Sequence, residues 1–161
     1  MKAKMALLFE GIYFRSMDSH GRIVIPANFR KVLIFTGSNK VMVSRFDKTL
    51  VTFTLAEWKE IKRSTLSLSK KSKAVSEFRK FFIDHAIKRS LDERGRILIP
   101  RDLRRYAEFE KAIVIVGLLN RFDILSLERW NQIKIEHTSD YATYRGYSGR
   151  LVENDIPDIT A

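Results

Sequence analysis

Two segments of the chain carry nearly the same residues in the same order. Asp18–Arg30 and Asp92–Arg104 are each thirteen residues long, and Asp, Gly, Arg, Ile, Ile, Pro and a final Arg are identical at seven equivalent positions. The second segment follows the first at an offset of 74 residues. Chance identity at this density is implausible, so we interpret the chain as a duplication. Its fold must therefore accommodate the same unit twice.

The similarity continues beyond these segments. Trp58 and Trp130, each followed three residues later by isoleucine, are 72 residues apart instead of 74. The register therefore slips by two residues between the first motif and the tryptophans. Because surface connections absorb changes of length most easily, we expect the slip in the loop between the first and the later strands. We expect both tryptophans in the core, because large apolar residues are mostly buried.

Each copy predicts the same local structure around its glycine. Gly21 and Gly95 supply the positive φ of a tight turn that joins one strand to a second, apolar strand. Pro26 and Pro100 end that second strand, because the residue before proline favours extended backbone and proline suits the first position of a helix. Apolar spacing after each proline predicts a helix. These helices cover residues 27–35 and 101–109.

The duplication favours an α+β, β-rich fold with flanking helices. About fifty residues per copy bury too little surface to stand alone comfortably, so we expect one fold that embraces both copies. Within the basic segment between the copies, Ser64–Ser72 predicts a loop between two helices. The predicted division is 12–55 for the first repeat, 56–85 for a basic helical connector, 86–130 for the second repeat, and 131–161 for a C-terminal helix and flexible tail.

The charge of the chain points to a polyanionic partner. Lys and Arg number 30 against 19 Asp and Glu, a formal net charge of +11, and a field of this sign makes nucleic acid the leading partner. An excess that merely keeps the protein soluble is the alternative. The absence of cysteine excludes disulfides and thiolate zinc sites. No apolar run reaches the roughly 20 residues of a membrane span and no export signal is recognised, so we expect a cytoplasmic protein without a membrane partner.

Catalysis has little support in the sequence. The three histidines, His20, His85 and His137, are not spaced as metal ligands, and no phosphate-binding Gly-rich loop or nucleophile motif occurs. We therefore expect no enzyme activity, no metal, no cofactor and no small-molecule substrate.

Arg22 and Arg96 directly follow the turn glycines. A long cation on a rigid turn can bind a phosphate, or the edge of guanine with two hydrogen bonds, so these arginines are the leading candidates for DNA binding. Asp18 and Asp92 lie four residues earlier and offer another role for the arginines, a salt bridge that braces the turn. Both roles can hold together, because an aspartate that orients the guanidinium preorganises it for DNA.

Other residues of the motif are weaker candidates. Arg30 and Arg104 lie one helical turn after proline, where they contact phosphates or lie solvated on the helix flank. The second role is favoured, because isolated surface arginines are common. The predicted DNA-binding set is completed by Gly21, Gly95, His20 and Arg94.

With both Asp-x-x-x-Arg motifs in view, the sequence closely resembles the MraZ family, whose members carry two SpoVT-AbrB-type swapped-hairpin units. Leu91–Ala107 and its continuation Gly117–Trp130 are especially typical, whereas Met17 and Ile12–Arg15 are less so. The resemblance implies an AbrB-like, swapped-hairpin barrel formed by the two repeats. It also implies a nucleoid-associated transcriptional regulator that binds short direct repeats in double-stranded DNA, upstream of the division and cell-wall gene cluster, and assembles into a ring-shaped homo-oligomer.

Two further interpretations stay open. An AbrB-fold antitoxin-like protein would need an extended segment that binds a toxin, and Asp140–Ala161 is the candidate for it. A module that binds single-stranded RNA would normally show exposed aromatic residues for stacking on bases, which the sequence does not clearly offer.

Overall fold

The same six elements occur in the same order in both halves of the chain. The structure, a computed structural model, describes residues 8–67 and 73–137. The first half contains β1 (Ile12–Ser16), β2 (Arg22–Val24), α2 (Ala27–Phe35), β3 (Lys40–Phe46), β4 (Thr49–Thr54) and α3 (Leu55–Ser67). The second contains β5 (Ile87–Ser90), β6 (Arg96–Leu98), α5 (Arg101–Tyr106), β7 (Ala112–Gly117), β8 (Arg121–Ser126) and α6 (Leu127–His137). Between them lie α4 (Lys73–Phe78) and the π-helical turn η1 (Arg79–Ile83).

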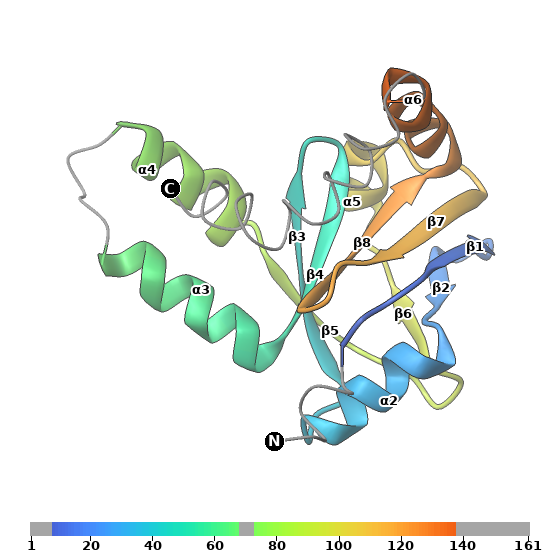
Figure 1. Cartoon of the computed structure of the whole chain (residues 1–161), viewed down its shortest axis with the longest axis horizontal. Helices are drawn as coiled ribbons and strands as arrows, with labels where there is room; N and C mark the ends of the chain where they lie inside the picture. Colours follow the sequence, from blue (N-terminus) through green and yellow to red (C-terminus); the bar gives the residue numbers. More distant parts are fainter. Residues whose placement is uncertain (1–7, 68–72, 138–161) are drawn as a thin grey trace.

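The two halves exchange their first strands. β1 pairs with β7 of the second repeat, β5 pairs with β3 of the first, and β4 and β8 pair at the centre (Figure 1). The result is an antiparallel sheet in the order β1-β7-β8-β4-β3-β5, with β2 and β6 forming a separate two-stranded ribbon. The predicted α+β, β-rich class is confirmed, and the exchange agrees with the swapped-hairpin units that the resemblance implies. Closure of the sheets into a barrel stays a prediction, as does the division into domains.

An approximate two-fold axis relates the two repeats. Ile23 and Ile97 are equivalent in the duplication and face each other across the ribbon. Val51 and Asp123 are equivalent at the offset of 72 and face each other across the β4–β8 pair. Because equivalent residues pair with each other at both places, the axis passes between both pairs. The turns that precede β2 and β6 are therefore equivalent about this axis, one at each end of the antiparallel ribbon.

The slip between the copies lies in the helix after proline and its exit. α2 has nine residues, as predicted, whereas α5 has six, so the prediction of a helix to residue 109 is wrong. The helix ends early because Glu108 adopts a positive φ of 55°. The predicted loop from Ser64 is also wrong in its first residues, since α3 continues through Ser67. Residues 68–72 and 138–161, including the predicted tail, lie outside the described residues.

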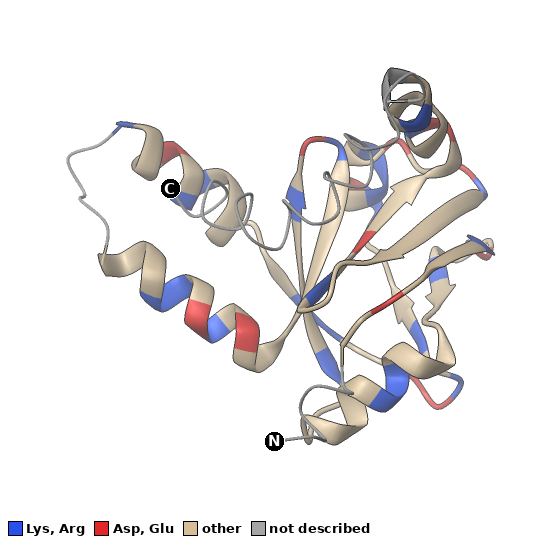
Figure 2. Ribbon diagram, viewed as in Figure 1, with Lys and Arg blue, Asp and Glu red and all other residues tan. Residues whose placement is uncertain are grey.

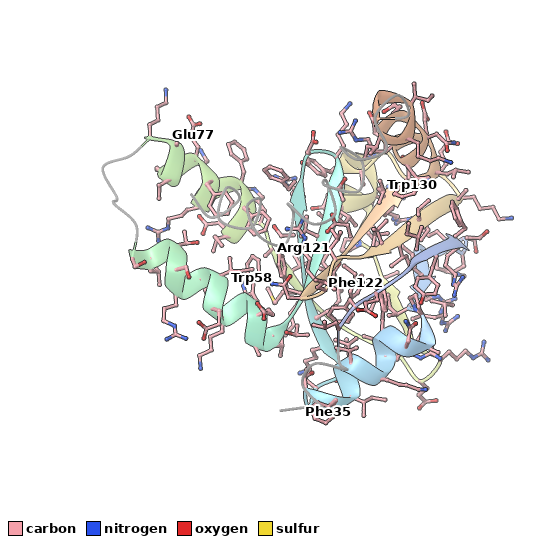
Figure 3. All side chains as sticks on the ribbon, viewed as in Figure 1. Phe35, Trp58, Glu77, Arg121, Phe122 and Trp130 are labelled. Atoms are coloured by element: carbon pink, nitrogen blue, oxygen red, sulfur yellow. The ribbon has the colours of Figure 1, made fainter. Side chains whose placement is uncertain are left out.

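The core contains the residues that the duplication repeats. Ile23 and Ile97 are fully buried beneath the ribbon, in the central apolar cluster. Trp58 on α3 and Trp130 on α6 each pack on the nearby strands of their own half and are 6% and 8% exposed, which confirms the predicted core positions (Figure 3). Phe82 of η1 packs beside Trp58. Among residues 8–67 and 73–137, no helix is both long and apolar enough to cross a membrane.

Candidate nucleic-acid interface

The turn between β1 and β2 is organised by one aspartate. The Asp18 carboxylate accepts hydrogen bonds from the backbone N–H groups of His20 at 2.9 Å and Arg22 at 2.8 Å, and from Arg22 Nε at 2.8 Å. The Gly21 N–H donates to the Asp18 carbonyl at 3.1 Å, which closes the turn. The carboxylate therefore fixes both the path of the backbone and the direction in which the arginine side chain leaves it.

The turn between β5 and β6 repeats this arrangement. Asp92 accepts hydrogen bonds from the backbone N–H groups of Arg94 and Arg96, both at 2.9 Å, and from Arg96 Nε at 2.8 Å. Gly95 N–H donates to the Asp92 carbonyl at 3.0 Å. The predicted bracing salt bridge is thus present in both copies.

The hydrogen bonds to the aspartates keep both of them ionised. The backbone N–H of Arg22, followed by its guanidinium and the N–H of His20, lowers the pKa of Asp18 to about 2. The equivalent groups, led by the backbone N–H of Arg96, lower the pKa of Asp92. Each arginine therefore lies beside a permanent negative charge at neutral pH, which orients the guanidinium through Nε.

The side chains of both arginines are partly exposed to solvent. The side chain of Arg22 is 35% exposed and that of Arg96 is 20% exposed. The remaining contacts of these ends are loose: Arg22 Nη2 lies 3.3 Å from Nδ1 of the exposed His20, and Arg96 Nη1 lies 3.9 Å from the Asp18 carboxylate. Each arginine is thus held at Nε, while its terminal nitrogens remain accessible to a further acceptor.

Each turn packs against an arginine on the helix of the opposite repeat. Arg30 on α2 lies over Gly95, and Arg104 on α5 lies over Gly21. A Cβ atom on Gly21 would lie 2.8 Å from Arg104 Cζ, and one on Gly95 would collide with Arg30 Cδ. Arg30 Nη1 also donates to the Ile25 carbonyl at 2.6 Å.

Glycine is required at both turns for two reasons. The φ angles of Gly21 (+86°) and Gly95 (+73°) lie in the left-handed region that favours glycine, and the space above each is filled by an arginine. This packing accounts for the presence of Arg30 and Arg104 in both copies without DNA. Their contact with phosphate stays a prediction.

The region around the turns carries a positive charge. Figure 2 shows basic and acidic residues side by side along the β5–β6 turn, next to the basic residues of α2. Five arginines and three carboxylates belong to the two turns, their following strands and the helix positions packed on them. The arginines are Arg22, Arg30, Arg94, Arg96 and Arg104, and the carboxylates are Asp18, Asp92 and Glu93. The exposed His20 and Arg94 lie at the tips of the turns. This arrangement suits a polyanion.

The histidines and the main cavity lie apart from any metal-binding cluster in the part of the chain that the structure describes. Among residues 8–67 and 73–137, no group of three His, Asp or Glu side chains could hold a metal ion. His20 lies in the first turn, His85 Nδ1 lies near the Lys80 carbonyl, and the His137 side chain is outside the described residues. A cavity of about 270 Å³ is lined by residues that include Trp130 and Asp123, and none of its lining residues belongs to the turns.

The sequence did not reveal a buried ion pair on β8. Arg121 and Asp123 are 1% and 7% exposed, and Arg121 Nε lies 3.3 Å from Asp123 Oδ1 (Figure 3). Burial raises the pKa of Asp123, while the charge of Arg121 opposes this shift. The equivalent residues of the first repeat, Thr49 and Val51, are uncharged. The alternation along β8 was the available signal, since it places both charges on one face.

The fold and the paired turns define a class of protein: a two-repeat, AbrB-like protein with exchanged strands, in which each repeat presents one aspartate-braced arginine. The family model described as "MraZ protein, putative antitoxin-like" matches the chain twice, over residues 8–79 and 82–144. The chain belongs to the MraZ family. This confirms the resemblance found in the sequence.

Relatives in this family align with most of the chain. A protein of Desulforapulum autotrophicum is 42% identical over 125 residues, which cover 78% of this chain and 84% of the relative. A protein of Halothermothrix orenii is 41% identical over 123 residues, covering 76% and 84%. A protein of Natranaerobius thermophilus is 34% identical over 149 residues, covering 92% of this chain and the whole relative. All three are named Transcriptional regulator MraZ, a name that agrees with the expectation of a regulator and not an enzyme.

Proposed function

We propose that this chain is a sequence-specific, DNA-binding transcriptional regulator that reads base edges with Arg22 and Arg96. The observation that carries the proposal is the duplicated brace. In both repeats an aspartate holds the arginine by Nε and by the backbone, while the terminal nitrogens remain accessible. The names of the relatives support regulation of transcription.

The ribbon has the shape and the donors for a major groove. A two-stranded β-ribbon fits the major groove of B-DNA, and guanine presents two acceptors there that match the fork of an arginine. Arg22 and Arg96 lie on neighbouring strands of one ribbon, so that a single groove can meet both. Because the aspartates fix the arginines before binding, little side-chain entropy is lost when DNA arrives. His20, Arg94 and the basic flanks add phosphate contacts that position the ribbon without reading sequence.

The proposed assembly is a ring-shaped homo-oligomer on short direct repeats upstream of the division and cell-wall gene cluster, in the nucleoid of the cytoplasm. This part of the proposal rests on the resemblance. Its physical advantage is effective concentration: when the spacing of the DNA repeats matches the spacing of subunits, several modest contacts combine into specific binding.

Selection of bound fragments from the organism's own DNA tests the proposal. The full chain is incubated with sheared genomic DNA and with RNA at the same salt, and bound fragments are sequenced. We expect recovery of duplex DNA that shares a short repeated sequence. Preferential recovery of RNA would contradict the proposal.

Variants of the two arginines then locate the reading site. Arg22→Ala and Arg96→Ala each remove a bidentate contact, so each lowers affinity for the recovered duplex by about 1–3 kcal/mol. If either arginine also neutralises a phosphate, its replacement lowers the salt slope by about 0.9. Arg63→Ala on α3 removes the same charge from a side chain that is 71% exposed, and it is the matched control. Folded Arg22→Ala and Arg96→Ala proteins that both bind like the Arg63→Ala control would remove the turns from the interface.

A further inference from the structure

The outer face of the ribbon carries two aliphatic residues beside the two arginines. In the register of β2 and β6, Arg22 lies opposite Leu98 and Val24 lies opposite Arg96. Side chains alternate along a strand, so Ile23 and Ile97 point inward and are fully buried, whereas these four point outward. The face is therefore a square with the arginines on one diagonal and the aliphatic residues on the other.

Val24 and Leu98 are exposed and lie outside the apolar core of the described residues. Val24 is 40% exposed and Leu98 is 44% exposed. Neither belongs to the three apolar clusters formed by the described residues. Both copies of the duplication nevertheless have an aliphatic residue at this position, two residues after the arginine. The duplicated unit thus repeats an outward apolar contact together with its outward cation.

We propose that Val24 and Leu98 read the methyl groups of thymine beside the guanines that Arg22 and Arg96 contact. This inference rests on the proposed function of the ribbon. In the major groove, thymine is the base that presents a methyl group, and aliphatic side chains recognise it by apolar contact. Residues directly opposite each other on two antiparallel strands have Cβ atoms about 4.5–5.5 Å apart, so each aliphatic side chain lies within one or two base steps of an arginine.

Charge selects DNA as the occupant of this face. Each aliphatic residue lies directly opposite a braced arginine, and five arginines against three carboxylates lie in and around the turns. An apolar protein surface that covered Val24 and Leu98 would also have to desolvate Arg22 and Arg96, which is costly without acceptors. The edge of a base pair offers a methyl group and hydrogen-bond acceptors side by side, so it matches both kinds of residue.

Replacement of thymine by deoxyuridine tests this inference on the wild-type protein. The duplex recovered by the genomic selection is synthesised with one thymine at a time replaced by deoxyuridine, which removes the methyl group and retains the hydrogen-bonding groups. We expect at least one replacement to weaken binding about four-fold, which corresponds to the roughly 0.8 kcal/mol of one buried methyl group. If no replacement changes the affinity, the inference is wrong.

Variants assign the methyl contact to its residue. In Val24→Ala or Leu98→Ala, the sensitive deoxyuridine replacement should weaken binding by less than about 1.5-fold, because the protein side of the contact has been removed. Ile135→Ala removes an exposed aliphatic side chain on α6 and should keep the wild-type sensitivity. An unchanged sensitivity in both ribbon variants overturns the inference. The inference is also wrong if the ribbon variants sediment differently from wild type without DNA while their sensitivity to deoxyuridine stays unchanged. That result would indicate that the face contacts another protein chain.

The two proposals fail in distinguishable ways. If Arg22→Ala and Arg96→Ala weaken binding but thymine methyl groups do not matter, the reading arginines remain and the methyl contact is wrong. If the arginine variants bind like wild type, the ribbon is not the reading surface, and both proposals are wrong.

Discussion

Replacing Gly95 by alanine tests the contact between the two repeats at the candidate interface. The φ of +73° costs a residue with a Cβ about 1–2 kcal/mol. The new methyl group would also collide with Arg30, whose Nη1 is held by the Ile25 carbonyl at 2.6 Å. Moving this side chain costs about 1 kcal/mol for the hydrogen bond and about 1 kcal/mol for a strained rotamer. We therefore expect Gly95→Ala to lower the free energy of unfolding by about 3–4 kcal/mol.

Gly37 provides the matched control. Its φ of +82° falls in the same region, but nothing lies within 4 Å of the position that a Cβ would take. Gly37→Ala should therefore cost only the backbone contribution of about 1–2 kcal/mol. The difference of about 2 kcal/mol corresponds to about 4–8 °C in Tm for a chain of this size. Gly21→Ala should fall between the two, because it meets the outer end of Arg104 at 2.8 Å.

A double-mutant cycle isolates the contact with Arg30. In the Arg30→Ala protein the methyl group of Gly95→Ala has room, so its cost should fall to that of Gly37→Ala. Urea unfolding followed by circular dichroism measures all four proteins of the cycle. Equal costs for Gly95→Ala and Gly37→Ala, or an unchanged cost of Gly95→Ala in the Arg30→Ala protein, would refute packing of the arginine over the opposite turn.

Three further outcomes are expected. Asp18→Asn should lower the free energy of unfolding above pH about 4, and the difference from wild type should disappear as the pH falls toward 2. The reason is that the pKa of about 2 in the fold lies below the roughly 3.9 of an unfolded aspartate. Urea unfolding at stepped pH measures this difference, and a difference that does not change with pH would contradict the prediction. Asp123→Val should cost about 3–5 kcal/mol because Arg121 stays buried without its partner, and Arg121→Met added to it should recover most of that stability in thermal unfolding. Phe82→Ala should lower the free energy of unfolding by about 3–5 kcal/mol, since Phe82 is 1% exposed. Phe81→Ala should lower it by less than about 1 kcal/mol, because Phe81 is 55% exposed. Similar losses for the two variants would contradict the packing of Phe82, and not Phe81, in the core.

Local chemistry made the turns and the core predictable from the sequence. Glycine at a positive φ and proline at a helix start constrain the backbone through their own geometry, so the positions of Gly21, Gly95 and the helix from Ala27 followed from residue type alone. The tryptophans followed from size and apolarity. The end of α5 did not follow, because it depends on Glu108 adopting a conformation that is unusual for its residue type.

Contacts between the repeats were beyond the sequence pattern. An alternating apolar strand does not specify its partner, so the residues alone could not pair β1 with β7, although the family resemblance implied exchanged hairpins. The sequence predicted Arg30 and Arg104 to be solvated or to bind phosphate. It could not reveal their packing over the glycines of the opposite repeat, because that packing depends on the exchange of strands.

The outward positions of Val24 and Leu98, by contrast, could have been predicted from the sequence. Each lies two residues after an arginine in a strand, and a period of two places it on the same outward face as that arginine.

Because both repeats lie in one chain, the two strands of the ribbon can carry different residues, which is impossible in a dimer of identical chains. A two-fold homodimer presents the same residues to both half-sites and so favours palindromic DNA. Here the two-fold relation is approximate: His20 corresponds to Arg94 and Val24 to Leu98, and the side chain of Arg22 is more exposed than that of Arg96. The two halves of one ribbon therefore present different groups to the proposed DNA groove. We expect the DNA sequence that one subunit reads to lack palindromic symmetry, and sequencing of the fragments recovered by the genomic selection measures this.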